Sequence, residues 1–363
     1  RAEIDLPAEV DPYADAVYEK ALENFQKLQS DGALVREPEP CLYLYRQTMG
    51  DHSQVGIAGV CHIDDYENDI IKKHEKTRKV KEDDRTRLVD TLSANTGPIF
   101  LTYKGESAVD GTVAQIMASE APAFDMVAED GVGHTVWRVA GEAAAAIEAA
   151  FAPVPSAYVA DGHHRTASAW RVGAERRAAN PNHNGTELYN WFLCVLFPAD
   201  QLRILPYNRA VSDLNGHTPE SLIEAIRAAG FYVEPAADKE PPAPCEVRMY
   251  LAGAWHAVKW DADPSADPVN ALDVSVLQNR LLDPILGIDD PRTNDRVDFI
   301  GGIRGVGELE KRVDSGSAGV AFAMYPVTVE QLMAISDAGQ IMPPKSTWFE
   351  PKLRSGFFIH TLD

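Results

Sequence analysis

The sequence is poor in cysteine, and what little it has is not arranged for metals or cross-links. Four cysteines in 363 residues, with no Cys-x-x-Cys spacing, argue against a disulfide scaffold and against a structural zinc site. Cys41, Cys61 and Cys194 lie in apolar, strand-like runs, where free thiols usually pack as small hydrophobic side chains. This usage suits a reducing cytoplasm, which is the location we expect.

Basic residues and long apolar runs are also scarce. With 34 Lys and Arg against 55 Asp and Glu, the net charge is −21, which argues against a nucleic-acid partner. No apolar run is long enough to span a membrane, and 45% hydrophobic with 25% charged residues is typical of a soluble globular protein. A small anionic ligand would therefore need a local basic pocket.

Such a basic feature occurs at residues 158–170, Tyr-Val-Ala-Asp-Gly-His-His-Arg-Thr-Ala-Ser-Ala-Trp. The apolar run 157–160 predicts the end of a buried strand, Asp161-Gly162 a turn, and the Ala-rich segment after it a helix. A helix start offers free N–H groups and a positive dipole end to an anion. His163, His164 and Arg165 stand where the dipole disfavours cations, and such a conflict is typical of a functional site. The alternative is that Asp161 caps the helix and the histidines are surface residues bonded to carbonyls.

Strands and helices alternate along the chain without a strict βαβ rhythm, which predicts an α+β protein with mixed sheets. The continuous apolar run 191–197 indicates a strand buried on both faces, and Pro198 ends it. We place a domain boundary there, giving one domain at 1–197 and a second α+β domain at 198–363.

Three further segments carry candidate chemistry. His74-Glu75-Lys76-Thr77 offers an acid–base pair, or is a solvated mixed-charge loop. Asp83-Asp84-Arg85 either complements a helix dipole or supplies a carboxylate pair to Mg²⁺. The Pro-rich segment 342–352 contains Lys345, Ser346 and Thr347; it closes over a phosphate-bearing ligand or is a rigid loop anchored by its aromatic residues.

Several of these motifs together resemble one family, the bacterial and archaeal family catalogued as domain of unknown function 1015. The segments that carry the resemblance are 160–165, 74–77, 84–85, 286–292 (Leu-Gly-Ile-Asp-Asp-Pro-Arg) and 342–349 (Met-Pro-Pro-Lys-Ser-Thr-Trp-Phe). They occur in order over essentially the whole chain. Members usually carry a further N-terminal Pro-Pro-Tyr-Asp-Val-like motif that these residues lack, so we expect part of the site to lie upstream.

The turn 161–165 is also similar to the phosphate-binding element of the ParB/sulfiredoxin fold, and to the free L-serine kinases of that superfamily in particular. The resemblance implies phosphoryl transfer to serine, with pyrophosphate or ADP/ATP as donor and Mg²⁺ as cofactor. It implies that Asp161, His163, His164 and Arg165 bind the transferring phosphoryl group and its metal. Gly162 belongs to the same phosphate-binding turn. From the residues themselves, Asp84 is a second candidate ligand for the metal, and Lys345 is expected to approach the phosphate from the C-terminal domain. Glu75 or His164 would take the hydroxyl proton, and Asp161 is the third catalytic candidate. The remaining candidates are His74, Thr77, Arg85, Ser346 and Thr347.

Two other functions stay open. One is a ParB-like module that senses a nucleotide or phosphate without kinase turnover, and the other is a kinase for a different small alcohol. No motif identifies a serine carboxylate uniquely, so the acceptor is undetermined. The sequence leaves a homodimer open and predicts neither a nucleic-acid nor a membrane partner.

Overall fold

The chain divides into two compact units, each with its own sheet. The computed structural model describes residues 5–363, of which 5–202 and 351–363 form the first unit and Arg203–Glu350 the second. The predicted boundary after residue 197 lies a few residues before the actual one. The return of Pro351–Asp363 to the first unit corrects the predicted two-part division. It arises because strand β18 (His360–Thr361) pairs with β4 (Ala94–Asn95), a contact that no local pattern announces.

An eight-stranded mixed sheet forms the centre of the first unit. Its spatial order is β3 (Ile71–Lys72), β8 (Ala157–Asp161), β5 (Ile99–Tyr103), β9 (Trp191–Pro198), β2 (His52–His62), β1 (Cys41–Met49), β7 (Gly133–Ala140) and β6 (Phe124–Val127). The β3–β8 and β5–β9 pairs are parallel and the others antiparallel. The apolar run predicted to be a doubly buried strand is β9, which is almost fully buried near the middle of this sheet. The α+β class is confirmed.

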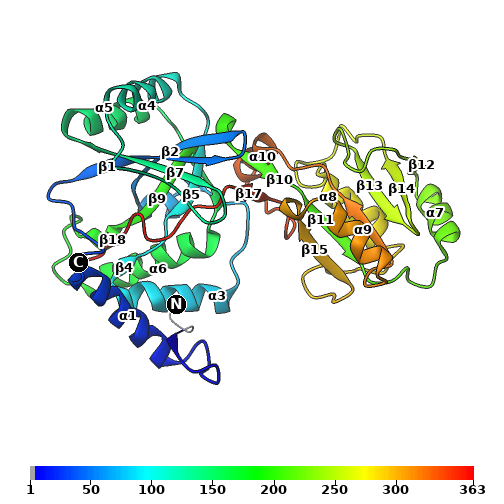
Figure 1. The fold of residues 1–363 in the computed structure, drawn as a ribbon, viewed down its shortest axis with the longest axis horizontal. Helices are drawn as coiled ribbons and strands as arrows, with labels where there is room; N and C mark the ends of the chain where they lie inside the picture. The colour runs from blue at the N-terminus through cyan, green and yellow to red at the C-terminus, as the bar shows by residue number, and fades with distance from the viewer. Residues whose placement is uncertain (1–4) are drawn as a thin grey trace. The chain divides into compact units, whose positions relative to one another are not determined.

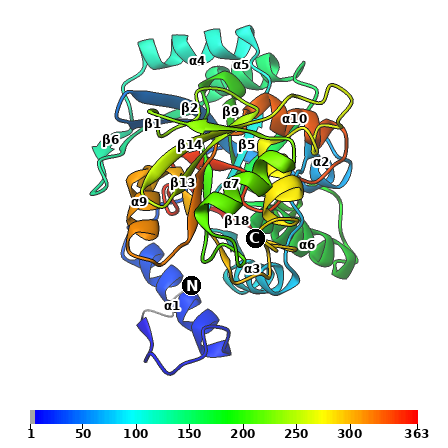
Figure 2. The same ribbon diagram turned by 90° about the vertical axis from the view of Figure 1, so that its right-hand side faces the viewer.

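Helices cover both faces of this sheet. Helices α4 (Ser107–Ser119) and α5 (Gly141–Phe151) lie on one face, and α3 (Lys79–Leu92) and α6 (His163–Ala179) on the other (Figure 1 and Figure 2). Helix α1 (Asp15–Ser30) packs on α3, and the short α2 (Ile63–Glu67) packs on α6. The 3₁₀ turns Leu188–Asn190 and Ala199–Gln201 flank β9. The α3–α6 pair matters most here, because it carries the candidate motifs.

The second unit is built on an antiparallel six-stranded sheet. Its order is β12 (Tyr232–Pro235), β14 (Ala254–Lys259), β13 (Glu246–Leu251), β16 (Val320–Ala323), β11 (Tyr207–Val211) and β15 (Val297–Gly301). A separate ribbon pairs β10 (Arg203–Leu205) with β17 (Trp348–Glu350). The helices of this unit are α7 (Pro219–Ala228), α8 (Asp273–Leu277) continued by a π-helical turn to Leu282, the 3₁₀ turn Gly302–Arg304, α9 (Gly307–Asp314) and α10 (Val329–Asp337).

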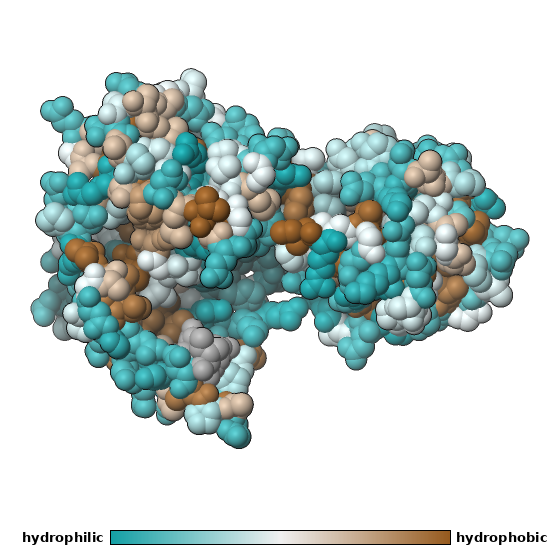
Figure 3. All heavy atoms as spheres, in the orientation of Figure 1, coloured by the Kyte–Doolittle hydropathy of each residue, from teal (hydrophilic) through white to brown (hydrophobic). Residues whose placement is uncertain are grey.

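Hydrophilic residues predominate on the face shown in Figure 3. None of the helices between residues 5 and 363 is both long and apolar enough to cross a bilayer.

Candidate functional site

The predicted strand–turn–helix forms at residues 157–179. Buried strand β8 ends at Asp161, and Gly162 turns the chain with φ 101° and ψ 28°, a left-handed conformation that glycine adopts without steric cost. Helix α6 then begins at His163 without a side-chain cap. Asp161 therefore does not cap the helix; its carboxylate accepts a hydrogen bond from Lys352 Nζ at 3.0 Å. The first N–H groups of α6 consequently have no side-chain acceptor at the N-cap.

Parallel pairing of β3 with β8 brings the His74 segment to this turn. Ile71 pairs with Ala157, and both strands run in the same direction, so the segments that follow them leave the same edge of the sheet. His74 Nε2 lies 3.3 Å from His163 Nε2. The backbone N–H of Arg78 donates to His164 Nε2 at 3.0 Å. Two clusters that are more than 80 residues apart in sequence thus meet in one place.

The three histidines of this region are neutral near pH 7. Burial lowers the pKa of His74 to about 4, although the nearby Asp161 carboxylate partly opposes this shift. Burial, with the neighbouring His74 and His164, holds the pKa of His163 well below its usual range. The pKa of His164 is also lowered by burial and by the neighbouring Arg78. Because His164 Nε2 accepts a hydrogen bond, its proton is on Nδ1. Of the three predicted cations at the helix start, only Arg165 is permanently charged.

Arg165 folds back over the turn. Its NH1 donates to the carbonyl of Pro98 at 2.9 Å, and a Cβ added at Gly162 would lie 3.3 Å from its Nε. A Cβ at Gly97 would lie 3.2 Å from its NH1. Burial lowers the pKa of Arg165, and the nearby Arg85 acts in the same direction while Asp161 opposes both. Glycine at both positions therefore leaves room for this guanidinium.

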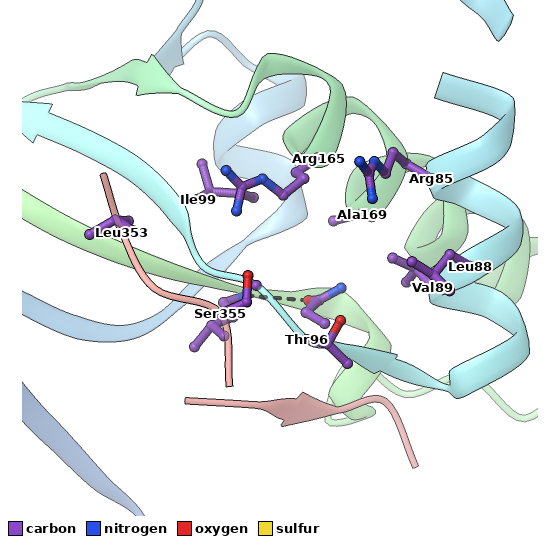
Figure 4. Close-up of a pocket in the computed structure, with 12 residues that line it drawn as sticks. Arg85, Leu88, Val89, Thr96, Ile99, Arg165, Ala169, Leu353 and Ser355 are labelled. Carbon is purple, nitrogen blue, oxygen red and sulfur yellow. Dashed lines mark hydrogen bonds between the residues drawn. The ribbon is translucent and has the colours of Figure 1, made fainter. Parts of the chain in front are cut away.

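A cavity of about 290 Å³ lies beside Arg165. Arg85 of α3 and Arg165 of α6 lie on one side of it in Figure 4, with Thr96 and Ser355 opposite. The other lining residues are Asn95, Gly97, Leu88, Val89, Ile99, Ala169, Leu193 and Leu353. Within the described part of the chain the lining contains no acidic residue. Arg85, predicted only as a minor candidate, thus shares a cavity with Arg165.

Other predicted residues have structural partners. The Asp84 carboxylate is buried and accepts a hydrogen bond from the Tyr18 hydroxyl at 2.7 Å. The Thr77 hydroxyl donates to Glu82 at 2.7 Å. Glu75 is exposed on the loop beside the turn. Asp161 is therefore the more accessible of the two predicted magnesium ligands. No group of three or more His, Cys, Asp or Glu residues arranged to hold a metal occurs among residues 5–363.

Residues 342–350 of the Pro-rich segment belong to the second unit. Lys345 is exposed, with φ 58°, and its carbonyl accepts a hydrogen bond from Arg209 at 3.2 Å. The buried Ser346 hydroxyl donates to the carbonyl of Pro343 at 2.7 Å, and Thr347 is half-buried. The loop lies in the second unit and the Asp161–Arg165 turn in the first, so the contribution of the loop to a phosphate site stays a prediction.

Sequence reasoning did not select Lys352 and Ser355 as site residues. Both lie in the segment 351–363 that returns to the first unit, where Lys352 contacts Asp161 and Ser355 lines the cavity. The only available signal was the lysine within the Pro-rich segment, and it could not be assigned to a unit without the tertiary structure.

Comparison with known proteins identifies the family. A model of the family described as protein of unknown function (DUF1015) matches residues 1–275. The chain belongs to the DUF1015 family. No curated protein matches it.

Solved structures similar to this DUF1015 protein share little sequence with it. They include a free serine kinase in complex with AMP, with 13% identity over 80% of this chain and 86% of that one, at a TM-score of 0.39. A conserved hypothetical protein from Pyrococcus furiosus shows 13% identity over 82% of this chain and 93% of that one, at a TM-score of 0.39. SbnI from Staphylococcus aureus, with a C-terminal truncation, shows 10% identity over 82% of this chain and 85% of that one, at a TM-score of 0.42. The activity of this DUF1015 protein is therefore inferred from its own site.

Proposed function

We propose that this protein is a phosphotransferase that binds a phosphoryl group at the Asp161–Arg165 turn and transfers it to the hydroxyl of a small molecule. The observation that supports this most strongly is the turn itself, where Gly162 provides no side-chain cap for the first N–H groups of α6 and the Arg165 guanidinium lies close to it. Free L-serine is the first acceptor to test, because the turn resembles that of the free-serine kinases. Pyrophosphate, ADP and ATP are the candidate donors.

The turn supplies what phosphoryl transfer needs, which is mainly positioning and neutralisation of charge. The uncapped N–H groups of α6 and its dipole favour an anion, and Gly162 allows close approach of the backbone. Arg165 adds a planar fork that matches phosphate oxygens. Lys352, held at Asp161, adds a second positive charge beside the turn. These groups would bind and orient the donor.

Glu75 is the better candidate for accepting the hydroxyl proton. The Nε2 atom of His164 already accepts a hydrogen bond from the Arg78 N–H, so its lone pair is engaged. Glu75 is exposed on the loop that His74 anchors beside the turn. When Mg²⁺ is bound it would neutralise phosphate charge, and Asp161 is the carboxylate that would hold it; one or two carboxylates plus phosphate oxygens suit this ion.

The test is phosphorus NMR of the full chain with Mg²⁺, L-serine and, in parallel, pyrophosphate, ADP or ATP. We expect a phosphoserine signal with one donor. Arg165→Gln should reduce its rate by about 100-fold, the scale of losing one charge-stabilising donor. Glu75→Gln should lower the rate with less effect on donor binding. The matched control is Arg171→Gln, on the same helix but in surface ion pairs with Asp83 and Glu175.

Two results would change the proposal. Phosphorylation of another small alcohol but not of serine would keep the phosphotransferase and replace its acceptor. Donor binding that depends on Arg165 without product from any acceptor would contradict the kinase and leave a nucleotide- or phosphate-sensing module.

A further inference from the structure

The cavity beside Arg165 has two chemically different sides. Arg85 and Arg165 provide positive charge, and Asn95, Thr96 and Ser355 provide polar atoms. The rest of the wall is apolar, formed by Leu88, Val89, Ile99, Ala169, Leu193 and Leu353. A bare inorganic ion would use only the charged side and would leave this apolar wall unoccupied.

Neither guanidinium forms an ion pair with a residue between 5 and 363, although the Asp161 carboxylate lies near Arg165. Arg85 makes no hydrogen bond or ion pair to any described residue, and Arg165 uses NH1 on the Pro98 carbonyl. The chain carries 55 acidic residues and a net charge of −21, yet none of the acidic residues between positions 5 and 363 lines this cavity. Because like charges repel, a bound anion would stabilise the pair. The lining is thus basic in an otherwise acidic protein.

We propose that this cavity binds a small organic anion whose head group, a carboxylate or a phosphate monoester, lies on Arg85 and Arg165 while a short apolar body contacts the leucine-rich wall. A cavity of about 290 Å³ has room for a short-chain organic acid. The site does not depend on phosphoryl transfer taking place.

Arg165 links this site to the turn. Its Nε lies against Gly162, whereas its NH1 lies near Gly97 and Ser355, which border the cavity. An anion in the cavity and a phosphoryl group at the turn therefore share one guanidinium. By thermodynamic linkage each should change the affinity of the other by the same factor.

The experiment measures binding to the full chain by isothermal titration calorimetry with two probe series, without any phosphoryl donor. One series runs from acetate to valerate and the other from methyl to butyl phosphate, with inorganic phosphate and pyrophosphate for comparison. We expect the affinity in one series to rise by about fourfold for each added methylene until the cavity is full. The series that shows the rise identifies the head group.

Two variants and a control make the result specific. Arg85→Gln should weaken binding at least tenfold, whereas Arg87→Gln, on the same helix but paired with Asp15, should not. Val89→Phe keeps both arginines and fills apolar space, so it should weaken only the longer probes.

Equal affinity for inorganic phosphate and for every organic probe would overturn the proposal, since the apolar wall would then contribute nothing. Binding that is insensitive to Arg85→Gln would overturn it as well. Kinase activity without organic-anion binding would refute this site alone, and binding without kinase activity would refute only the phosphotransferase.

Discussion

The Nε2 atoms of His74 and His163 lie 3.3 Å apart, and the two rings are nearly perpendicular, at 89°. One nitrogen must donate and the other accept, so at least one of the two rings must be neutral for this contact to form. Both side chains are buried, at 2% and 5% exposure. Protonation of either ring would place an unsolvated charge beside its neighbour, and folding is therefore linked to pH at this pair.

We expect the first unit to lose stability as the pH falls from about 6.5 to about 4. A histidine pKa near 6.5 in the unfolded chain and about 4 for folded His74 means that the unfolded state binds more protons in this window. The contribution of neutral His74 to the free energy of unfolding is fully present above pH 6.5. It is lost as the pH falls, and the loss reaches roughly 3 kcal/mol at pH 4. Urea denaturation across this range measures it. His74→Gln should flatten the dependence and His52→Gln should not.

Titration of Asp273 in the second unit changes the stability in the opposite direction, so this residue is replaced before the histidine effect is measured. Burial raises its pKa to about 6, so its stabilising contribution is present at low pH and is lost as the pH rises from about 4 to 6. An Asp273→Asn background therefore isolates the histidine effect. A first unit whose stability is unchanged between pH 6.5 and 4 in this background would contradict the linkage.

Gly162→Ala should weaken pyrophosphate binding in addition to lowering the free energy of unfolding. The backbone there has φ 101°, and forcing an L-residue into the left-handed region costs about 1–2 kcal/mol. The control is Gly185→Ala, with φ 93° but no atom within 4 Å of an added Cβ. Both variants should lower the free energy of unfolding similarly in denaturation experiments. Only Gly162→Ala should displace Arg165 and weaken pyrophosphate binding; equal binding by both variants would argue against a phosphate at this turn.

Lys352→Ala tests the ion pair with Asp161. Both side chains are about half-exposed, at 46% and 38%, so removing the pair should change the free energy of unfolding by less than about 1 kcal/mol. The same change removes a positive charge from the turn and should weaken donor binding by about tenfold, measured by calorimetry. Lys104→Ala, an exposed lysine elsewhere in the first unit, is the control. Donor affinity equal to the wild type would exclude Lys352 from the site.

Tyr18→Phe tests whether Asp84 has a structural role or binds a metal ion. The Tyr18 hydroxyl donates to Asp84 in a buried setting, and removing it should cost about 1–3 kcal/mol of stability. Tyr43→Phe removes a hydrogen bond of the same length to Glu37 at the surface and should cost less. Magnesium titrations of any transfer reaction should be unchanged in Tyr18→Phe. A shifted magnesium requirement with unchanged stability would instead support Asp84 as a metal ligand.

The sequence by itself determined the strand, turn and helix at residues 157–179. The causes are local there: an apolar run favours a buried strand, glycine permits the positive φ, and an Ala-rich segment favours helix. The buried strand β9 followed in the same way from its continuous apolar residues. The α+β class follows from the summed pattern of such elements.

Only the tertiary structure decided which distant residues share the site. Parallel pairing of β3 with β8 placed His74 against His163, and pairing of β18 with β4 returned Lys352 and Ser355 to the first unit. These contacts depend on strand order and on burial over the whole sheet, which local propensity does not encode. Burial also made the histidines neutral, so the charge at the turn is a property of the fold rather than of the motif.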